Sequence, residues 1–265
     1  MKILAITNQK GGVGKTTTAV NLAAALGAAG QRVLLIDMDP QGNATTGAGI
    51  TKKEALPTVY QLLIGAAGLQ EVCIATEFAF DILPANRELA GAEVELIELE
   101  RREFRLKEAL AEGRASYDFV LIDCPPALNM LTVNALVAAD SVLIPMQCEY
   151  YALEGLSDLV ETLRKIRHSL NARLEIEGLL RTMYNSQSTL TQQVSSELEN
   201  YFGDKVYQTI VPRNVRLAEA PSYGKPVLLY DLKCVGSQAY LRLALRLDPS
   251  RDEAWVLLGD LMNQN

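Results

Sequence analysis

Short apolar runs alternate with longer amphipathic stretches along most of the 265-residue chain. The runs are rich in Val, Ile and Leu and lie at residues 2–7, 32–37, 80–84, 117–123, 141–145, 176–184 and 206–211. They have few polar positions, which is typical of strands covered on both faces, whereas a half-exposed strand alternates apolar and polar residues. The pattern therefore predicts strands that are buried on both sides.

Apolar residues recur at helical spacing between these runs, which predicts helices near residues 15–29, 86–113, 129–139, 153–170, 190–202 and 236–247. Strands that alternate with helices form parallel sheets, because each crossover helix packs on a face of the sheet. We expect an α/β fold with a doubly wound, mostly parallel sheet and helices on both faces. No Pro-, Gly- or Ser-rich linker divides the chain, so we expect a single domain over residues 1–265.

The end of the chain has a pattern of its own. Residues 239–265, AYLRLALRLDPSRDEAWVLLGDLMNQN, look like the junction of a helical repeat, but no second copy of such a unit occurs. A single unit cannot bury its own apolar face. We expect an atypical helical tail at about 236–265 that closes the domain as a helix pair.

Composition and charge limit the class of protein. The chain is 49% hydrophobic, enough for a sizeable core, and its net charge of −7 argues against a basic nucleic-acid binder as a whole. Residues 213–246 differ from the rest, because they carry six Lys or Arg against Glu219 and Asp231. A local basic surface could therefore still meet phosphate groups.

The cysteines and the apolar runs bear on the compartment. Cys73, Cys124, Cys148 and Cys234 form no CxxC pair and no metal-like spacing, which favours reduced thiols in a cytoplasmic protein. The sequence begins on an apolar strand without a signal peptide, and no apolar run approaches the roughly 20 residues of a membrane span. We expect a soluble, cytoplasmic protein.

A glycine-rich loop joins the first predicted strand to the first predicted helix, within residues 8–20, NQKGGVGKTTTAV. Glycines let backbone N–H groups approach phosphate oxygens, and the positive end of the helix faces them. In this context Lys15 would reach the β- and γ-phosphates, the Thr16 hydroxyl would bind Mg²⁺, and Thr17 would contact the α-phosphate. The loop therefore predicts a nucleotide site.

The loop departs from the usual G-x-x-x-x-G-K-[ST] pattern. Counting back from Gly14, the first glycine of that pattern falls on Gln9, whereas Lys10 stands at the mouth of the loop before Gly11 and Gly12. The ordinary pattern has no role for this second lysine.

Carboxylates end two of the predicted strands. Asp37 and Asp39 follow the second strand, and Asp123 ends the run at 117–123. The carboxyl ends of parallel strands meet at one edge of a doubly wound sheet, beside the phosphate loop. Asp123 is suited to hold the Mg²⁺ shell through water, so these acids strengthen the prediction of a nucleotide site.

Together these motifs resemble the ParA/MinD family of ATPases. KGGVGKTT (10–17) is that family's deviant Walker A motif. DMDPQGN (37–43), DCPP (123–126), EYYALEGL (149–156) and VPRNVRLAEAPSYGKPVLLYD (211–231) are similar to the chromosomal ParA, or Soj, branch. The resemblance covers about residues 1–232. It implies a P-loop NTPase fold, Mg²⁺-dependent hydrolysis of ATP that is slow without a partner, and a homodimer formed with ATP.

The resemblance also assigns catalytic roles. Lys10 matches a signature lysine that crosses the dimer interface to the partner's nucleotide phosphates, as an arginine finger does. Asp39 matches the residue that positions or activates the attacking water, and Asp123 matches the Walker B acid. Catalysis is thus expected of Lys10, Lys15 and Asp39, and metal binding of Thr16, Asp39 and Asp123. Asp37 is either structural or an indirect partner of the Mg²⁺.

Nucleotide contacts are expected along the whole loop, at Lys10, Gly11, Gly12, Val13, Gly14, Lys15, Thr16 and Thr17. By resemblance, Pro212, Arg213 and Asn214 flank the adenine, with the TMYN segment (182–185) opposite.

The resemblance further implies that the ATP dimer binds double-stranded DNA without sequence preference. Arg216 matches a DNA-contacting arginine of the family, and Lys225, Arg242 and Arg246 lie in the same net-positive part of the chain. Two such surfaces across a two-fold axis would double the phosphate contacts and the salt dependence. A ParB-like protein on centromere DNA would stimulate hydrolysis, and the ATPase would associate with the nucleoid and drive chromosome or plasmid partition.

One position departs from the family. The stretch TMYNSQSTL (182–190) has Gln187 where relatives commonly carry an arginine that contacts DNA in some of them. We therefore expect DNA binding that is weaker and more salt-sensitive, or compensated by residues such as Lys205 or Arg242.

Other functions remain open. Related ATPases position non-DNA cargo by the same cycle, and the sequence does not separate the two. A MinD-like membrane role is disfavoured because the tail carries Asp248, Asp252, Glu253 and Asp260 against Arg251. Iron–sulfur chemistry would need cluster cysteines, and the spacing of Cys124 and Cys148 does not suit one. Amide-ligase chemistry would need a small-substrate pocket, and EYYALEGL favours ParA instead.

Overall fold

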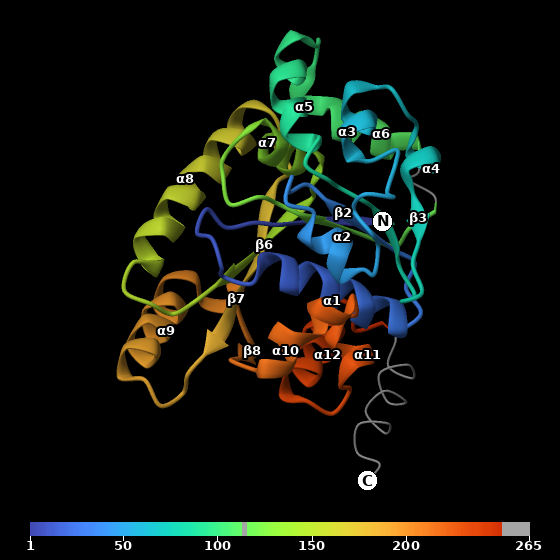
Figure 1. Cartoon of the computed structure of the whole chain (residues 1–265). Helices are drawn as coiled ribbons and strands as arrows, with labels where there is room; N and C mark the ends of the chain where they lie inside the picture. Colours follow the sequence, from blue (N-terminus) through green and yellow to red (C-terminus); the bar gives the residue numbers. More distant parts are fainter. Residues whose placement is uncertain (113–115, 251–265) are drawn as a thin grey trace.

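The structure, a computed structural model, describes residues 1–112 and 116–250, whose strands form one eight-stranded sheet (Figure 1). The strand order is β3-β4-β2-β5-β1-β6-β7-β8. β3 pairs antiparallel with β4, and the other pairings among the described strands are parallel. The strands are β1 Lys2–Ile6, β2 Val33–Asp37, β3 Ile74–Ala75, β4 Asp81–Leu83, β5 Phe119–Asp123, β6 Ser141–Met146, β7 Glu175–Tyr184 and β8 Val206–Pro212.

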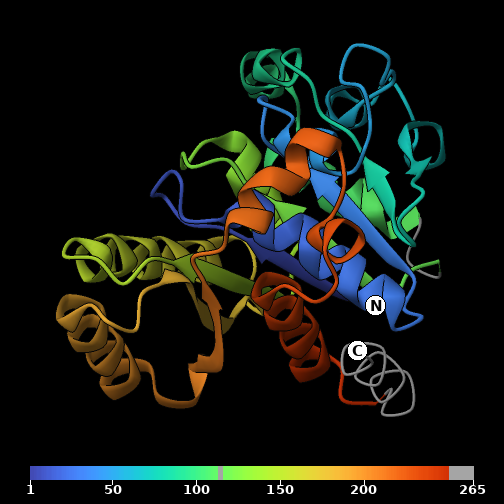
Figure 2. The same ribbon diagram turned by 60° about the horizontal axis from the view of Figure 1, so that its bottom comes forward.

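Helices cover both faces of this sheet. In Figures 1 and 2, α12 lies beside α1 on one face, while α7 and α8 pack into the core on the other. The helices are α1 Lys15–Ala28, α2 Asn43–Gly47, α3 Val59–Ile64, α4 Leu69–Val72, α5 Leu89–Glu95, α6 Arg105–Glu112, α7 Met130–Ala138, α8 Ala152–Ser169, α9 Thr189–Phe202, α10 Val215–Glu219, α11 Val227–Tyr230 and α12 Val235–Leu247. The predicted doubly wound α/β fold is confirmed.

The continuous apolar runs have a simple origin in this arrangement. Along β1, Ile3 and Ala5 face the core beneath α7 and α8, whereas Leu4 and Ile6 face the core beneath α1 and α12. Successive side chains of a strand point to opposite faces, so a strand with two covered faces needs apolar residues at nearly every position.

The single long helix predicted at 86–113 is wrong. The chain forms α5, then 3₁₀ turns at Leu96–Glu98 and Arg102–Phe104, and then α6. Leu99 is extended and Arg101 is left-handed with φ 53°, which no continuous helix allows. Leu96 and Leu106 are both fully buried in the same core, so the chain bends between them.

Several short elements had no prediction, namely α2, α3, α4, β3, α10 and α11. None of them exceeds six residues. Such segments are too short for a hydrophobic period to be recognised. Of the predicted tail, α12 confirms a helix at 236–247, and residues 251–265 lie outside the described part of the chain. Within the described residues no helix is long and apolar enough to cross a membrane.

The register of the central strands creates the candidate site. Asp123 at the end of β5 pairs in register with Ile6 of β1 and with Asp37 of β2. The loop that leaves β1, and both acidic strand ends, therefore meet at the carboxyl edge of the sheet.

Candidate functional site

The glycine loop between β1 and α1 exposes a positive helix end. Gly12 and Gly14 have φ of 75° and 87°, a left-handed conformation that costs other L-residues about 1–2 kcal/mol. Gly14 is the residue before α1, where no side chain caps the helix, and the first turn has no acidic residue. The N–H groups of this turn are left for an external anion, as in phosphate-binding loops.

The loop is held in place by Asn8, for which the sequence predicts no role, and by Thr182 of the TMYN segment. Asn8 donates from Nδ2 to the carbonyl of Pro145 (2.9 Å) and accepts the Lys10 N–H at Oδ1 (2.9 Å). Thr182 of β7 donates from Oγ1 to the carbonyl of Val13 (2.8 Å). The loop is thus tied to β6 and β7, the two strands that follow β1 in the order of the sheet, through contacts between residues far apart in sequence.

Lys15 lies inside the loop. It is 7% exposed, and its Nζ donates to the carbonyl oxygen of Lys10 at 2.9 Å. Burial lowers the pKa of Lys15, and the charge of Asp123 offsets only part of this effect. A buried ammonium that relies on one carbonyl is well prepared to bind a phosphate oxygen.

Asp123 is fully buried, and within residues 1–112 and 116–250 no group lies in hydrogen-bonding geometry to either of its oxygens. Burial raises its pKa, the nearby Asp37 adds to the rise, and the Thr16 hydroxyl offsets only part of it. Buried carboxylates are usually paired or bound to a cation. This unpartnered acid beside Thr16 therefore fits a divalent cation.

The donor set favours Mg²⁺ over a metal held by protein alone. Among residues 1–112 and 116–250, no group of three or more His, Cys, Asp or Glu side chains could bind a metal by itself. Mg²⁺ takes few protein ligands and completes its shell with water and substrate phosphate oxygens. Thr16 and Asp123 supply oxygen donors of that kind.

Asp37 and Asp39 have different surroundings. Asp37 is fully buried and accepts the Asp39 N–H (3.1 Å), the Thr45 N–H (2.8 Å) and the Thr45 hydroxyl (2.7 Å). Burial raises the pKa of Asp37 to about 6. Its oxygens hold the turn into α2, which favours the structural alternative. The Asp39 side chain is partly exposed, and within the described residues its carboxylate accepts a single hydrogen bond, from the Gln41 N–H (2.9 Å), so it can still reach a water molecule.

A cavity of about 180 Å³ adjoins the loop. It is lined by Pro212, Arg213 and Asn214, the residues expected to flank the adenine, together with Gly14 and Thr17. The Oδ1 of Asn214 is buried and has no hydrogen-bond partner in the described part of the chain. An unsatisfied acceptor at a small, mostly apolar cavity suits a ligand with an amino group.

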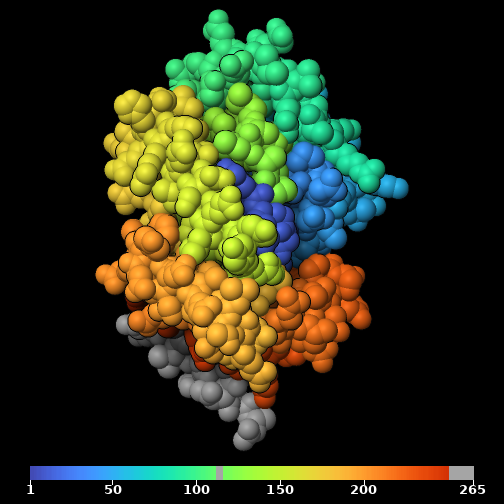
Figure 3. Space-filling view, turned by 90° about the vertical axis from the view of Figure 1, so that its left-hand side faces the viewer, coloured from blue at the N-terminus to red at the C-terminus, as the bar shows by residue number. Residues whose placement is uncertain are grey.

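Lys10 lies at the mouth of the loop, not within it. Its Nζ is 2.6 Å from Oε2 of Glu149, and the two side chains are 42% and 51% exposed. Figure 3 shows the dark-blue atoms of the N-terminal loop on this face beside the yellow-green segment near residue 150. In the sequence Glu149 stands out only as the first residue of the EYYALEGL motif, because nothing there indicates its partner.

Arg216 is not a free surface cation. Its Nη1 is 2.9 Å from Oε2 of Glu219, its Nε is 3.3 Å from Oδ2 of Asp231, and its guanidinium lies 6.0 Å from the ring centre of Tyr230. Lys225 is exposed on the same segment and lines a cavity of about 280 Å³ that reaches Thr16.

The other two predicted DNA contacts lie elsewhere. Arg246 lines a cavity with Val206 and Tyr207, which begin β8, whereas Arg216 follows the end of that strand. The seven residues of β8 separate the two ends by about 20 Å. Arg242 lies one helical turn before Arg246 on α12. Within one subunit, the structure therefore does not bring all four residues into one patch.

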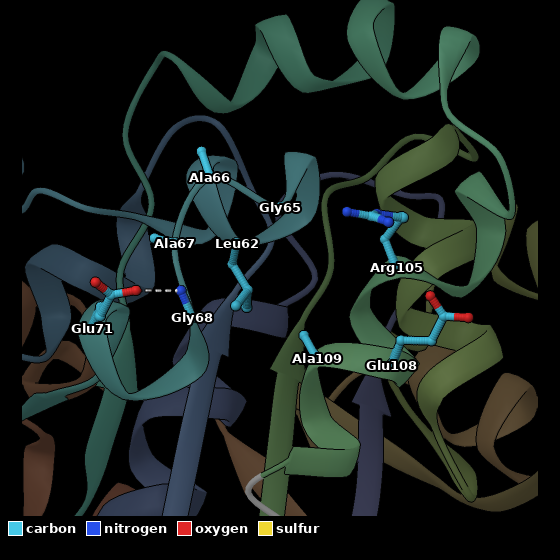
Figure 4. Close-up of a pocket in the computed structure, with 9 residues that line it drawn as sticks. All are labelled: Leu62, Gly65, Ala66, Ala67, Gly68, Glu71, Arg105, Glu108 and Ala109. Carbon is cyan, nitrogen blue, oxygen red and sulfur yellow. Dashed lines mark hydrogen bonds between the residues drawn. The ribbon is translucent and has the colours of Figure 1, made fainter.

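A further hollow of about 400 Å³ lies between α6 and the loop after α3. In Figure 4, Arg105 of α6 points toward the small residues of that loop, and Glu71 of α4 accepts the Gly68 N–H at 2.7 Å. None of the predicted site residues lines this hollow.

Similarity to known proteins decides the family. A family model described as an AAA domain matches residues 1–176. The chromosome partitioning protein ParA of Caulobacter vibrioides is 56% identical over 247 residues, which cover 92% of each chain. The sporulation initiation inhibitor protein Soj of Bacillus subtilis is 55% identical over 244 residues, which cover 92% of this chain and 96% of that protein. The chain belongs to the ParA/Soj family of partition ATPases.

Solved structures agree with the ParA/MinD fold. Cobyrinic acid a,c-diamide synthase from Mycobacterium smegmatis, with bound ADP and magnesium, has a TM-score of 0.83 at 36% identity and covers 93% of this chain and 94% of its own. The septum site-determining protein MinD from Pyrococcus horikoshii, in complex with Mg-ADP, has a TM-score of 0.79 at 26% identity and covers 96% and 98%. The ParA/Soj loop with its two lysines thus lies on a fold that binds Mg-ADP in these relatives.

Proposed function

We propose that the protein is an ATP-dependent dimerising switch that partitions DNA. It binds ATP with Mg²⁺, closes into a homodimer over the nucleotide, and binds DNA non-specifically in that state. A ParB-like partner on centromere DNA stimulates hydrolysis and releases the dimer. The observation that carries this proposal is the division between the two lysines: Lys15 is buried in the loop, and Lys10 lies half-exposed at its mouth.

Nucleotide binding rests on groups within one subunit. The uncapped first turn of α1 and the buried Lys15 would hold the phosphates, and Thr16 with Asp123 would hold Mg²⁺. Bound Mg²⁺ would neutralise charge on the β- and γ-phosphates. Asn214 would accept a hydrogen bond from the adenine amino group, with Pro212 and Arg213 beside the base.

Hydrolysis requires the second subunit. Asp39 positions the attacking water, while Lys10 of each subunit neutralises developing phosphate charge in the other. Because the lone subunit does not supply this cation from its own loop, its hydrolysis is slow. ATP hydrolysis therefore depends on dimerisation, and a partner protein can accelerate the slow hydrolysis.

DNA binding rests on the exposed basic residues. Arg216 and Lys225 lie on the segment after β8, while Arg242 and Arg246 lie on α12. A two-fold axis would present each group twice and steepen the salt dependence of binding. A cytoplasmic, nucleoid-associated location follows from this activity.

A second candidate is the positioning of a non-DNA cargo by the same ATP cycle. It is favoured by Gln187 in place of the family arginine and by the two carboxylates beside Arg216. Both features weaken the electrostatic attraction for DNA.

The experiment that separates the two candidates is a salt series of binding to non-specific duplex DNA. It is carried out with ATP, with ADP and without nucleotide. Partition predicts binding with ATP only, falling steeply as salt rises. No binding in any state, beside a normal ATP dimer in light scattering, would reject DNA partition and leave the non-DNA cargo.

A further inference from the structure

The geometry points to Glu149 as a positioning residue that keeps Lys10 within its own subunit until nucleotide binds. This inference rests on the proposed role of Lys10 in the ATP dimer. It adds a nucleotide-dependent route by which that lysine is released to the partner.

The backbone of Lys10 is fixed on both sides. Its N–H donates to Oδ1 of Asn8 at 2.9 Å, and its carbonyl accepts Nζ of Lys15 at 2.9 Å. The side chain is therefore the part of Lys10 that can move without breaking the loop. Its ammonium contacts Oε2 of Glu149 at 2.6 Å.

Glu149 is itself held by backbone contacts. Its N–H donates to the carbonyl of Gln147 at 3.0 Å, and its own carbonyl accepts the Ala152 N–H at 3.0 Å, at the start of α8. These contacts fix the main chain of Glu149, so its side chain starts from a fixed position beside the mouth of the loop. An ion pair this exposed is weak enough to be exchanged, because exposed pairs shift an equilibrium constant by up to about fivefold.

The two lysines form a chain of contacts from the phosphate loop to this carboxylate. Lys15 holds the carbonyl of Lys10, and Lys10 holds Glu149. A phosphate in the loop competes for Lys15, because an anion is a stronger acceptor than a backbone carbonyl. Withdrawal of Lys15 frees the Lys10 carbonyl and loosens the segment that carries the second lysine. Occupancy of one subunit's loop is in this way transmitted to the residue that acts on the other subunit.

The surroundings of Glu149 suit an interface between two copies of this chain. Tyr150 and Tyr151 follow it directly and are 75% and 68% exposed. Their rings pack edge to face with their centres 5.0 Å apart. Large exposed aromatic side chains are enriched at protein interfaces. Closure of the dimer over this face would cover both rings while Lys10 leaves Glu149 for a phosphate of the partner's nucleotide.

The test is the ATP concentration required for half-maximal dimerisation, measured by light scattering. Glu149→Gln removes the charge and keeps the shape, and we expect it to lower that concentration by about two- to fivefold. Glu154→Gln is the matched control, because Glu154 is exposed in the first turn of the same helix and should leave the concentration unchanged. Glu149→Asp, which keeps the charge, should stay close to the wild type.

A second readout follows the lysine itself. Acetylation of Lys10 by acetic anhydride, quantified by mass spectrometry, should be faster with ADP than without nucleotide in the wild type. In Glu149→Gln it should be fast in both conditions. Equal rates with and without ADP in the wild type would overturn the transmission from Lys15 to Lys10.

The dimerisation outcomes separate this inference from the proposed function. If the wild type dimerises with ATP but Glu149→Gln needs the same or a higher concentration, Glu149 does not retain Lys10. A higher concentration would show instead that Glu149 stabilises the dimer. If the wild type does not dimerise with ATP at all, the proposed switch fails and this inference fails with it.

Discussion

The ammonium of Lys15 donates a hydrogen bond to the carbonyl oxygen of Lys10, 2.9 Å away. The side chain of Lys15 is thus bonded to the main chain of Lys10, although the two ammonium groups have different partners. Lys15 is directed into the buried loop, and Lys10 to Glu149 at its mouth. This difference makes separate predictions for the two residues.

Lys15→Ala should abolish tight nucleotide binding. The buried ammonium is proposed to make charge-assisted contacts with phosphate, each worth about 1.5–3 kcal/mol, so we expect a loss of affinity of about tenfold or more. Isothermal titration with an ATP analogue and Mg²⁺ measures this directly. Thr16→Ala should lose affinity specifically in the presence of Mg²⁺. Tight Mg-ATP binding by both variants would refute the assignment of the loop.

Lys10→Ala should bind nucleotide yet remain monomeric with ATP. The change removes the cation proposed to act on the other subunit, and it leaves both backbone contacts of residue 10 possible. Light scattering with ATP and titration with ADP report the two properties separately. An ATP dimer of normal stability would exclude action of Lys10 across the interface.

Asp39→Ala should still form the ATP dimer but should hydrolyse ATP much more slowly. The carboxylate is partly exposed just after β2 and is proposed to position the attacking water, and loss of such a group typically lowers turnover by about 100-fold or more. Phosphate release and dimer lifetime are the two measurements. Asp37→Ala offers a contrast, because it should destabilise the turn into α2 and lower the melting temperature. Undiminished turnover in Asp39→Ala would contradict its catalytic role.

Arg216→Glu should retain the ATP dimer and lose DNA. The substitution places a third carboxylate beside Glu219 and Asp231, so the local potential becomes negative. Arg173→Glu makes the same charge change at an exposed residue between α8 and β7 and serves as the control. Gel shifts with ATP compare the two variants. If both bind DNA like the wild type, the DNA surface lies away from the segment after β8.

Glu177 should make folding stability depend on pH in the acid range. Burial alone would raise its pKa, but hydrogen bonds from Lys2 (2.7 Å) and Ser141 (2.8 Å) hold the pKa below its usual value. The folded protein therefore releases this proton more readily than the unfolded chain. The resulting stability is present above the unfolded pKa and is lost as pH falls through the folded pKa. We expect Glu177→Gln to cost about 1 kcal/mol at pH 7 and less below pH 4, as measured by urea unfolding. An equal cost at both pH values would show that the ion pair is not the cause.

Local sequence patterns were enough to predict the layers of this fold. Nearly unbroken apolar runs such as residues 33–37 are typical of strands with two covered faces, and the helices between them favour parallel pairing. The broken helix at 96–106 was not predictable in this way. The residues between Leu96 and Leu106 mix apolar and charged positions at helical spacing, so no local signal marks the break, and the chain bends because both leucines are buried in one core.

Residue types at short, fixed spacing were sufficient to predict the phosphate loop, the acids at the strand ends and the family. The fold, by contrast, decided that Asp37 accepts three hydrogen bonds whereas Asp123 accepts none from the described residues. It likewise decided that Lys10 meets Glu149 and that Arg216 has two acidic neighbours. These contacts depend on which segments the parallel register and the crossover helices bring to one edge of the sheet, and partners up to 139 residues apart leave no local signal in the chain.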